Sequence, residues 1–134
     1  MSDYISWSET SWATQEERLA VDTKDAQLHI GIPKEREMNE HRILLTPESV
    51  QMLVNVGHGI KIESGAGDLA GFNDMMYADA GAEITSSSLE VFQCEIIAKV
   101  APPTEEEISK MKGSQTLISA LQLRTRDRAY FKAL

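Results

Sequence analysis

The sequence has a single cysteine, few aromatic side chains and fewer basic than acidic residues. Aromatic residues make up 6% of the 134 residues, and 21 acidic residues face 13 basic ones, for a formal net charge of −8. The lone Cys94 excludes an internal disulfide, which suits a reducing cytoplasm, and we expect it to be buried beside a strand. The acidic balance argues against nonspecific binding to nucleic acid or to an anionic membrane.

Long apolar runs are also absent. No segment approaches the ~20 apolar residues that a membrane span needs, and the first residues lack the basic and apolar blocks of a signal peptide. The three histidines show no spacing typical of metal ligands. We therefore expect a cytoplasmic protein without a metal ion, a membrane segment or a nucleic-acid partner.

Charge is unevenly spread along the chain. Residues 1–27 contain six acidic and two basic side chains together with Tyr4, Trp7 and Trp12. This polar composition favours a loosely ordered extension, although the aromatic residues leave open an arm that docks on the domain or on a neighbouring subunit. Residues 28–134 form the predicted domain, long enough to bury a core.

From residue 28 short apolar stretches alternate with helical patterns. We predict strands over 28–33, 59–63, 82–85, 95–100 and 115–123, and helices over 46–58, 73–81, 86–93, 104–111 and 125–134. Such alternation indicates βαβ units and a mainly parallel sheet between two helical layers. The pattern continues to Leu134 without a closing element, so we expect a longer parent protein.

The helix over 46–58 has the clearest boundaries. Thr46 is the expected N-cap, Pro47 occupies the first helical position, and Gly57 is the expected stop. The predicted apolar stripe of this helix consists of Val50, Leu53, Val54 and Val56.

A glycine-rich stretch follows the second predicted strand. A dinucleotide fingerprint needs G-x-G-x-x-G running into a helix, whereas Gly65 and Gly67 are followed by Gly71, one position too late. Asp68 and Asp74 would also repel a bound phosphate. The spacing favours a structural turn over a phosphate site.

Several stretches resemble the N-terminal domain of the alanine dehydrogenase and pyridine nucleotide transhydrogenase family. They are "IGIPKEREMNEHRILLTPESV" (30–50), "GHGIKIESGAGDLAGFND" (57–74), "YADAGAEI" (77–84), "IIAKVAPP" (96–103) and, less closely, "LISALQL" (117–123). The resemblance implies a flavodoxin-like (Rossmann-like) strand order. It also implies NAD as cofactor, bound by a later Rossmann domain that this chain lacks, so no residue here is expected to bind it.

Arg42, in "NEHR", matches the family's arginine for the substrate carboxylate. A guanidinium grips a carboxylate with two parallel hydrogen bonds, and Arg42 follows the end of the first strand, where open α/β folds bind ligands. From the residues themselves, a surface arginine paired with Glu37 or Glu40 is an equal alternative.

Two other family positions carry different chemistry here. The family's substrate-binding lysine, the second in "K-V-K-E-P", corresponds to Ala101, and its acid/base histidine in "L-H-L" corresponds to Gln122. Alanine cannot bind an anion, and glutamine cannot exchange protons near neutral pH. Lys99 and Arg124, each two residues from a changed position, could compensate; alternatively Lys99 serves the fold and Arg124 faces solvent.

The resemblance leaves three functions open. The first is an NAD-dependent dehydrogenase that converts L-alanine or a related amino acid to the oxo acid and ammonia, with this chain forming the substrate side of the cleft. The others are the N-terminal domain of an NAD(P) transhydrogenase alpha subunit and a diverged non-catalytic relative. The full-length protein is expected to be a homo-oligomer, and the isolated chain to be inactive.

Overall fold

The computed structural model describes residues 26–122 and 126–134. Tyr4, Trp7, Trp12 and Arg124, which the sequence singled out, lie outside the described residues. The described chain alternates short strands and helices from His29 to Ala133.

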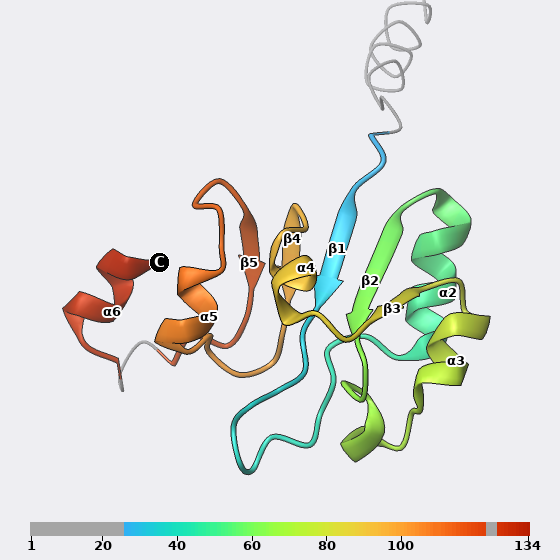
Figure 1. Ribbon diagram of the computed structural model, residues 1–134, viewed down its shortest axis with the longest axis horizontal. Coiled ribbons are helices and arrows are strands. Elements are labelled where there is room, and N and C mark those ends of the chain that lie inside the picture. Colours follow the sequence, from blue (N-terminus) through green and yellow to red (C-terminus); the bar gives the residue numbers. More distant parts are fainter. Residues whose placement is uncertain (1–25, 123–125) are drawn as a thin grey trace, which may run out of the picture.

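Five parallel strands form one sheet (Figure 1). They are β1 (His29–Ile32), β2 (Gly59–Glu63), β3 (Glu83–Thr85), β4 (Ile96–Ala98) and β5 (Thr116–Ile118). Each lies within a stretch predicted from the sequence, and the parallel arrangement is confirmed.

The order of the strands corrects one expectation. The sheet runs β3-β2-β1-β4-β5, which is the Rossmann type of order, whereas the flavodoxin type runs 2-1-3-4-5. The difference arises because the chain builds outward from β1 through β2 to β3 before it crosses back to place β4 on the other side of β1. Alternation along the sequence predicts parallel strands but does not state which strand pairs with which.

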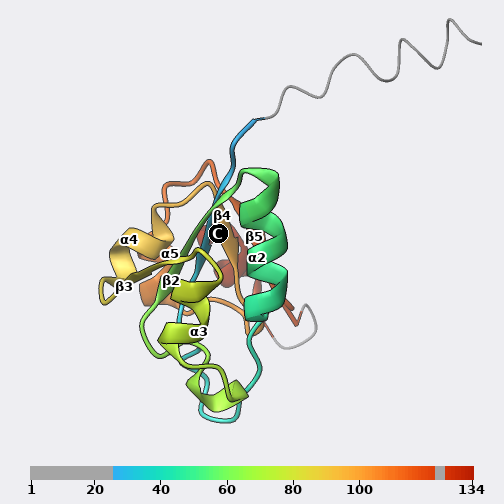
Figure 2. The ribbon, with the colours of Figure 1, turned by 90° about the vertical axis from the view of Figure 1, so that its right-hand side faces the viewer.

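Helices cover both faces of the sheet (Figure 2). They are α2 (Pro47–Val56), α3 (Asp74–Asp79), α4 (Ser88–Phe92), α5 (Glu105–Ser109) and α6 (Arg128–Ala133), with a 3-10 turn η1 (Asp68–Ala70). Thr46 caps α2 by accepting a hydrogen bond from the Ser49 backbone N–H, and Gly57 ends it in the left-handed conformation, as predicted. The three-layer α/β/α architecture is therefore confirmed.

The core is divided between the two faces of the sheet. Val50 of α2 and Tyr77 of α3 belong to a cluster with alternate residues of β1 and β2, whereas Phe92 of α4 packs with Cys94 and Ile97 in a second cluster. Gly31 belongs to the second face: a Cβ atom there would lie 2.2 Å from the backbone oxygen of Val91. Glycine at this position lets α4 lie directly against β1.

The predicted apolar stripe of α2 is wrong at one residue. Val50 is completely buried and Leu53 and Val54 pack against the core, but Val56 is 72% exposed. At 100° per residue, Val56 lies about 240° around the helix from Val50 and faces solvent.

Candidate functional site

The strand order reverses between β1 and β4, and the loops that follow these strands meet at the carboxyl edge of the sheet, the lower edge in Figure 1. Open α/β sheets bind ligands in the crevice at such a switch point. The residues after β1 begin with Pro33 and reach the α2 cap at Thr46, and those after β4 begin with Lys99. The candidate site is built from these two segments and from the chain after β5.

A cavity of about 260 Å³ lies elsewhere, lined by residues including His29, Gly59, Glu83 and Cys94. His29, Gly59 and Glu83 begin their strands and Cys94 precedes β4, so this cavity lies at the amino edge. Parallel sheets bind ligands at the opposite edge. A larger cavity of about 460 Å³, lined by residues including Leu28, Glu95 and Thr116, also lies at the amino edge. Cavity size therefore does not identify the site, and we place it at the carboxyl edge.

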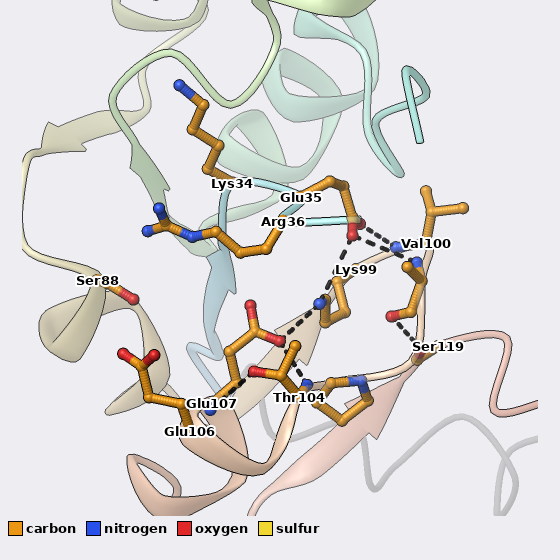
Figure 3. Close-up of polar contacts among 12 residues, drawn as sticks. Lys34, Glu35, Arg36, Ser88, Lys99, Val100, Thr104, Glu106, Glu107 and Ser119 are labelled. Atoms are coloured by element: carbon orange, nitrogen blue, oxygen red, sulfur yellow. Dashed lines mark hydrogen bonds and ion pairs between the residues drawn. The ribbon is translucent and has the colours of Figure 1, made fainter. Parts of the chain in front are cut away.

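A buried ion cluster joins the segments at the carboxyl edge. The Lys99 side chain is 1% exposed, and its ammonium lies 2.9 Å from the carboxylate of Glu107 and 3.6 Å from that of Glu35. Figure 3 shows the two carboxylates approaching Lys99 from the loop after β1 and from the start of α5. Two acids surround one cation, and the Glu107 Oε1 atom is buried with no hydrogen-bond partner within the described chain.

Glu35 also binds the backbone of the segment after β4. Its carboxylate accepts hydrogen bonds from the backbone N–H groups of Val100 and Ala101. The same segment is connected to the chain after β5, because Ser119 donates its hydroxyl to the Ala101 carbonyl at 2.8 Å and the Ala120 N–H donates to the Val100 carbonyl. Three loops are thus held together at the switch point.

Arg42 forms a two-pronged ion pair with Glu40. Arg42 Nε and Nη2 each donate to one carboxylate oxygen of Glu40 at 2.8 Å. These hydrogen bonds lower the pKa of Glu40 to about 2 and raise the pKa of Arg42. The surface pair with Glu40 that the sequence raised as the alternative is therefore present. The Arg42 side chain is 76% exposed, so its guanidinium is accessible from solvent at this edge while Glu40 fixes its orientation.

Ala101 and Gln122 follow neighbouring strands at the same edge. Ala101 is 6% exposed, and both its backbone N–H and its carbonyl are hydrogen-bonded. Gln122 is exposed and has a φ of 51°, in the left-handed region that a non-glycine residue seldom adopts. Such conformations are found more often at functional sites than elsewhere.

The glycine turn after β2 does not fit a pyrophosphate. The Gly65 N–H donates to the Asp74 carboxylate at 2.8 Å, so an internal anion already occupies it. A side chain at Gly67 would lie 2.6 Å from both the Phe72 carbonyl oxygen and the Tyr77 ring. Gly65 and Gly71 have positive φ angles of 75° and 86°, which agrees with the turn that the sequence favoured.

Sequence reasoning missed Glu35 and Glu107. Glu107 forms a capping box with Thr104, since each side chain accepts from the other's backbone N–H, and the T-E-E-E stretch signals this motif. No comparable signal marks Glu35, because its partners lie 64 to 66 positions further along the chain.

Other predicted features can be compared directly with the described chain. Cys94 is 8% exposed and its burial raises the pKa of the thiol, as expected for a structural cysteine. Residues 26–122 and 126–134 contain no group of three or more His, Cys, Asp or Glu side chains placed to hold a metal ion. None of the helices described is long and apolar enough to cross a membrane.

Comparison with known proteins agrees with this architecture. The family model described as "Alanine dehydrogenase/PNT, N-terminal domain" matches residues 31–134. The chain is 39% identical over 94 residues to the alanine dehydrogenase of Bacillus subtilis, which covers 70% of this chain and 25% of that protein. It is 42% identical over 90 residues to NAD(P) transhydrogenase subunit alpha of Haemophilus influenzae, covering 67% of this chain and 17% of that subunit.

Solved structures show the same fold. An L-alanine dehydrogenase matches with a TM-score of 0.76 and 37% identity over 80% of this chain. A transhydrogenase from Sinorhizobium meliloti matches with a TM-score of 0.64 and 31% identity over 68% of this chain. The chain covers 29% and 27% of these two structures. It thus spans about a quarter or less of the length of the curated relatives described above. The fold, the motifs and the matched residues together show that the chain belongs to the alanine dehydrogenase/PNT family, in its N-terminal domain.

Proposed function

We propose that the chain forms the substrate side of the cleft in a cytoplasmic, homo-oligomeric NAD-dependent amino-acid dehydrogenase. The reaction would oxidise L-alanine or a related amino acid to the oxo acid and ammonia, with the hydride passed to NAD. The observation that carries this proposal is the position and state of Arg42: an oriented, charged and accessible guanidinium beside the switch point.

NAD would be bound elsewhere in the full-length protein. The glycine turn does not fit its pyrophosphate, because the Gly65 N–H is taken by Asp74 and Gly67 has no room for a closer contact. We propose that this domain binds the substrate carboxylate and helps to exclude water from the crevice. The isolated chain is accordingly proposed to be inactive.

Ala101 and Gln122 are proposed to slow the oxidation of L-alanine. Ala101 supplies no cation and Gln122 no proton-exchanging group, so Arg42 would be the main cation for the substrate carboxylate. Lys99 is not placed to replace the absent lysine at 101, because its ammonium is buried against Glu35 and Glu107. Oxidation of L-alanine is therefore expected to be slow, since loss of an acid/base group costs roughly 10²–10⁴ in rate.

A transhydrogenase subunit is the second candidate. The 42% identity to NAD(P) transhydrogenase subunit alpha supports it, and hydride exchange between two nucleotides would need no amino-acid site, which agrees with Ala101. A transhydrogenase function, however, does not require the accessible guanidinium of Arg42. A diverged non-catalytic relative is the third.

One assay of the full-length protein separates the candidates. The protein is incubated with NAD and each L-amino acid in turn, and separately with NADH and an oxidised nucleotide analogue. Formation of NADH from an amino acid supports the dehydrogenase. Hydride exchange between nucleotides without amino-acid oxidation supports the transhydrogenase subunit, and the absence of both reactions supports the non-catalytic relative.

A further inference from the structure

We propose that Glu35 is a positioning residue of the substrate crevice, which fixes residue 101 through its backbone, and that Lys99 is the buried counter-ion of this arrangement. The role in substrate binding rests on the proposed function. The structural part of the proposal rests on the contacts of Glu35 and can be tested without any enzymatic activity.

The Glu35 carboxylate crosses from the loop after β1 to the segment after β4. One oxygen accepts from the Val100 N–H, and the other accepts from the Ala101 N–H at 3.4 Å and lies 3.6 Å from the Lys99 ammonium. Successive backbone N–H groups form a concave binding site for anions. The chain's own carboxylate therefore occupies an anion site at the switch point, so this spot is closed to a substrate carboxylate.

Residue 101 is held from its other side as well. Ser119 donates its hydroxyl to the Ala101 carbonyl at 2.8 Å. With the N–H bound to Glu35 and the carbonyl bound to Ser119, both peptide groups flanking the Ala101 Cα have fixed partners. The direction of its Cα–Cβ bond, and hence of any side chain placed there, is set by these two contacts.

Lys99 makes the burial of Glu35 possible. A carboxylate removed from water is stable only when it is paired and hydrogen-bonded, and Lys99 lies between Glu35 and Glu107 (Figure 3). The two acids differ in their further contacts. Glu107 accepts from the Thr104 N–H within the α5 cap, whereas Glu35 alone of the pair binds Val100 and Ala101.

Glu35 also affects Arg42, which lies in the same loop after β1. Its negative charge contributes, after that of Glu40, to the raised pKa of Arg42. One side chain thus binds the backbone at residue 101 and stabilises the charge of the proposed carboxylate-binding residue. The hydrogen bonds from the Val100 and Ala101 N–H groups are what distinguish Glu35 from a glutamate that serves only the core.

The difference between the two acids provides a matched pair of variants. Glu35→Gln leaves Lys99 paired with Glu107, and Glu107→Gln leaves it paired with Glu35, so each variant retains one balanced ion pair. In Glu35→Gln one acceptor oxygen becomes an NH₂ donor, so Val100 or Ala101 loses its acceptor. In Glu107→Gln the Val100 and Ala101 N–H groups both keep the Glu35 carboxylate as their acceptor.

Amide hydrogen exchange followed by NMR in the 134-residue chain is the first test. In Glu35→Gln, exchange at Val100 or Ala101 should accelerate about tenfold or more beyond the change at the Ile97 amide in the core. In Glu107→Gln the same amides should follow Ile97. Equal behaviour of the two variants at Val100 and Ala101 would overturn the proposal.

Steady-state kinetics of the full-length protein is the second test. Glu35→Gln should raise KM for the amino acid about tenfold with a smaller change in kcat, and Glu107→Gln should leave KM unchanged. Equal KM values in both variants would reduce Glu35 to a structural role and overturn the proposal. If the wild-type protein oxidises no amino acid, the proposed function fails, and the exchange experiment still decides whether Glu35 positions residue 101.

Discussion

The ammonium of Lys99 lies 2.9 Å from the carboxylate of Glu107, and both side chains are at least 96% removed from solvent. Removal of one partner from a buried ion pair typically costs about 3–5 kcal/mol, because the remaining charge is left without compensation. Here Glu35 would be left without its cation as well. The stability of the domain is therefore expected to depend strongly on Lys99.

Lys99→Met should lower the free energy of unfolding by about 3–5 kcal/mol in urea denaturation. Lys61→Met is the matched control, since Lys61 is also an ion-paired lysine of the sheet region but its partners Glu83 and Glu90 are exposed. Lys61→Met should lower the free energy of unfolding by no more than about 1 kcal/mol. Similar losses in the two variants would show that burial of the Lys99 cluster contributes little.

Gly31→Ala should destabilise the fold by about 1–3 kcal/mol or more, because the added Cβ meets the backbone oxygen of Val91 at 2.2 Å and α4 must move. Gly59→Ala is the control: its Cβ meets only the His29 side chain, at 2.9 Å, and that side chain is 59% exposed and can turn away. Thermal unfolding of both variants provides the measurement. A higher melting temperature for Gly31→Ala than for Gly59→Ala would contradict the close packing of α4 on β1.

Tyr77 should make stability fall at alkaline pH. Burial raises its pKa from 10.0 to about 12, and its hydroxyl donates to the Leu45 carbonyl. A group whose pKa is raised on folding contributes stability that is present below the unfolded value and lost as pH rises through the folded value. Between pH 10 and 12, unfolding should become easier by roughly 3 kcal/mol.

The measurement is urea unfolding at a series of alkaline pH values, with Tyr77→Phe as control. The variant should lose the hydroxyl–carbonyl bond and, with it, the part of the decline between pH 10 and 12 that Tyr77 contributes, while the part from other buried groups such as Tyr130 should remain. An identical decline in the variant and the wild-type chain would assign the effect to other groups.

Local signals in the sequence predicted the elements well. Thr46 and Gly57 bound α2 as expected because a cap is satisfied by residues within one turn of it. The strand order could not be obtained in this way, since pairing depends on contacts between distant segments. Family resemblance supplied a flavodoxin-like order, and the observed pairing of β1 with β2 and β4 corrected it.

The contacts of the candidate site could likewise be predicted only where the partners lie close together in the sequence. The pairing of Arg42 with Glu40 was one of the alternatives that the residues themselves raised, because the two lie two positions apart. The partners of Lys99 could not be deduced, since Glu35 comes from a strand end 64 positions earlier. A lysine near a strand end can be a substrate ligand or a core ion, and in the fold its burial between two acids distinguishes these roles.

If Arg42 binds the carboxylate of an amino-acid substrate, kcat/KM of the full-length protein for its best amino acid should depend on this side chain. Arg42→Ala should lower kcat/KM by about 10²-fold or more, and Arg42→Lys should restore only part of it, because an ammonium cannot form the two-pronged contact. The Arg42 side chain is largely exposed, so its loss should leave the melting temperature almost unchanged. Unaltered kcat/KM in a folded Arg42→Ala variant would show that Arg42 does not bind the substrate carboxylate.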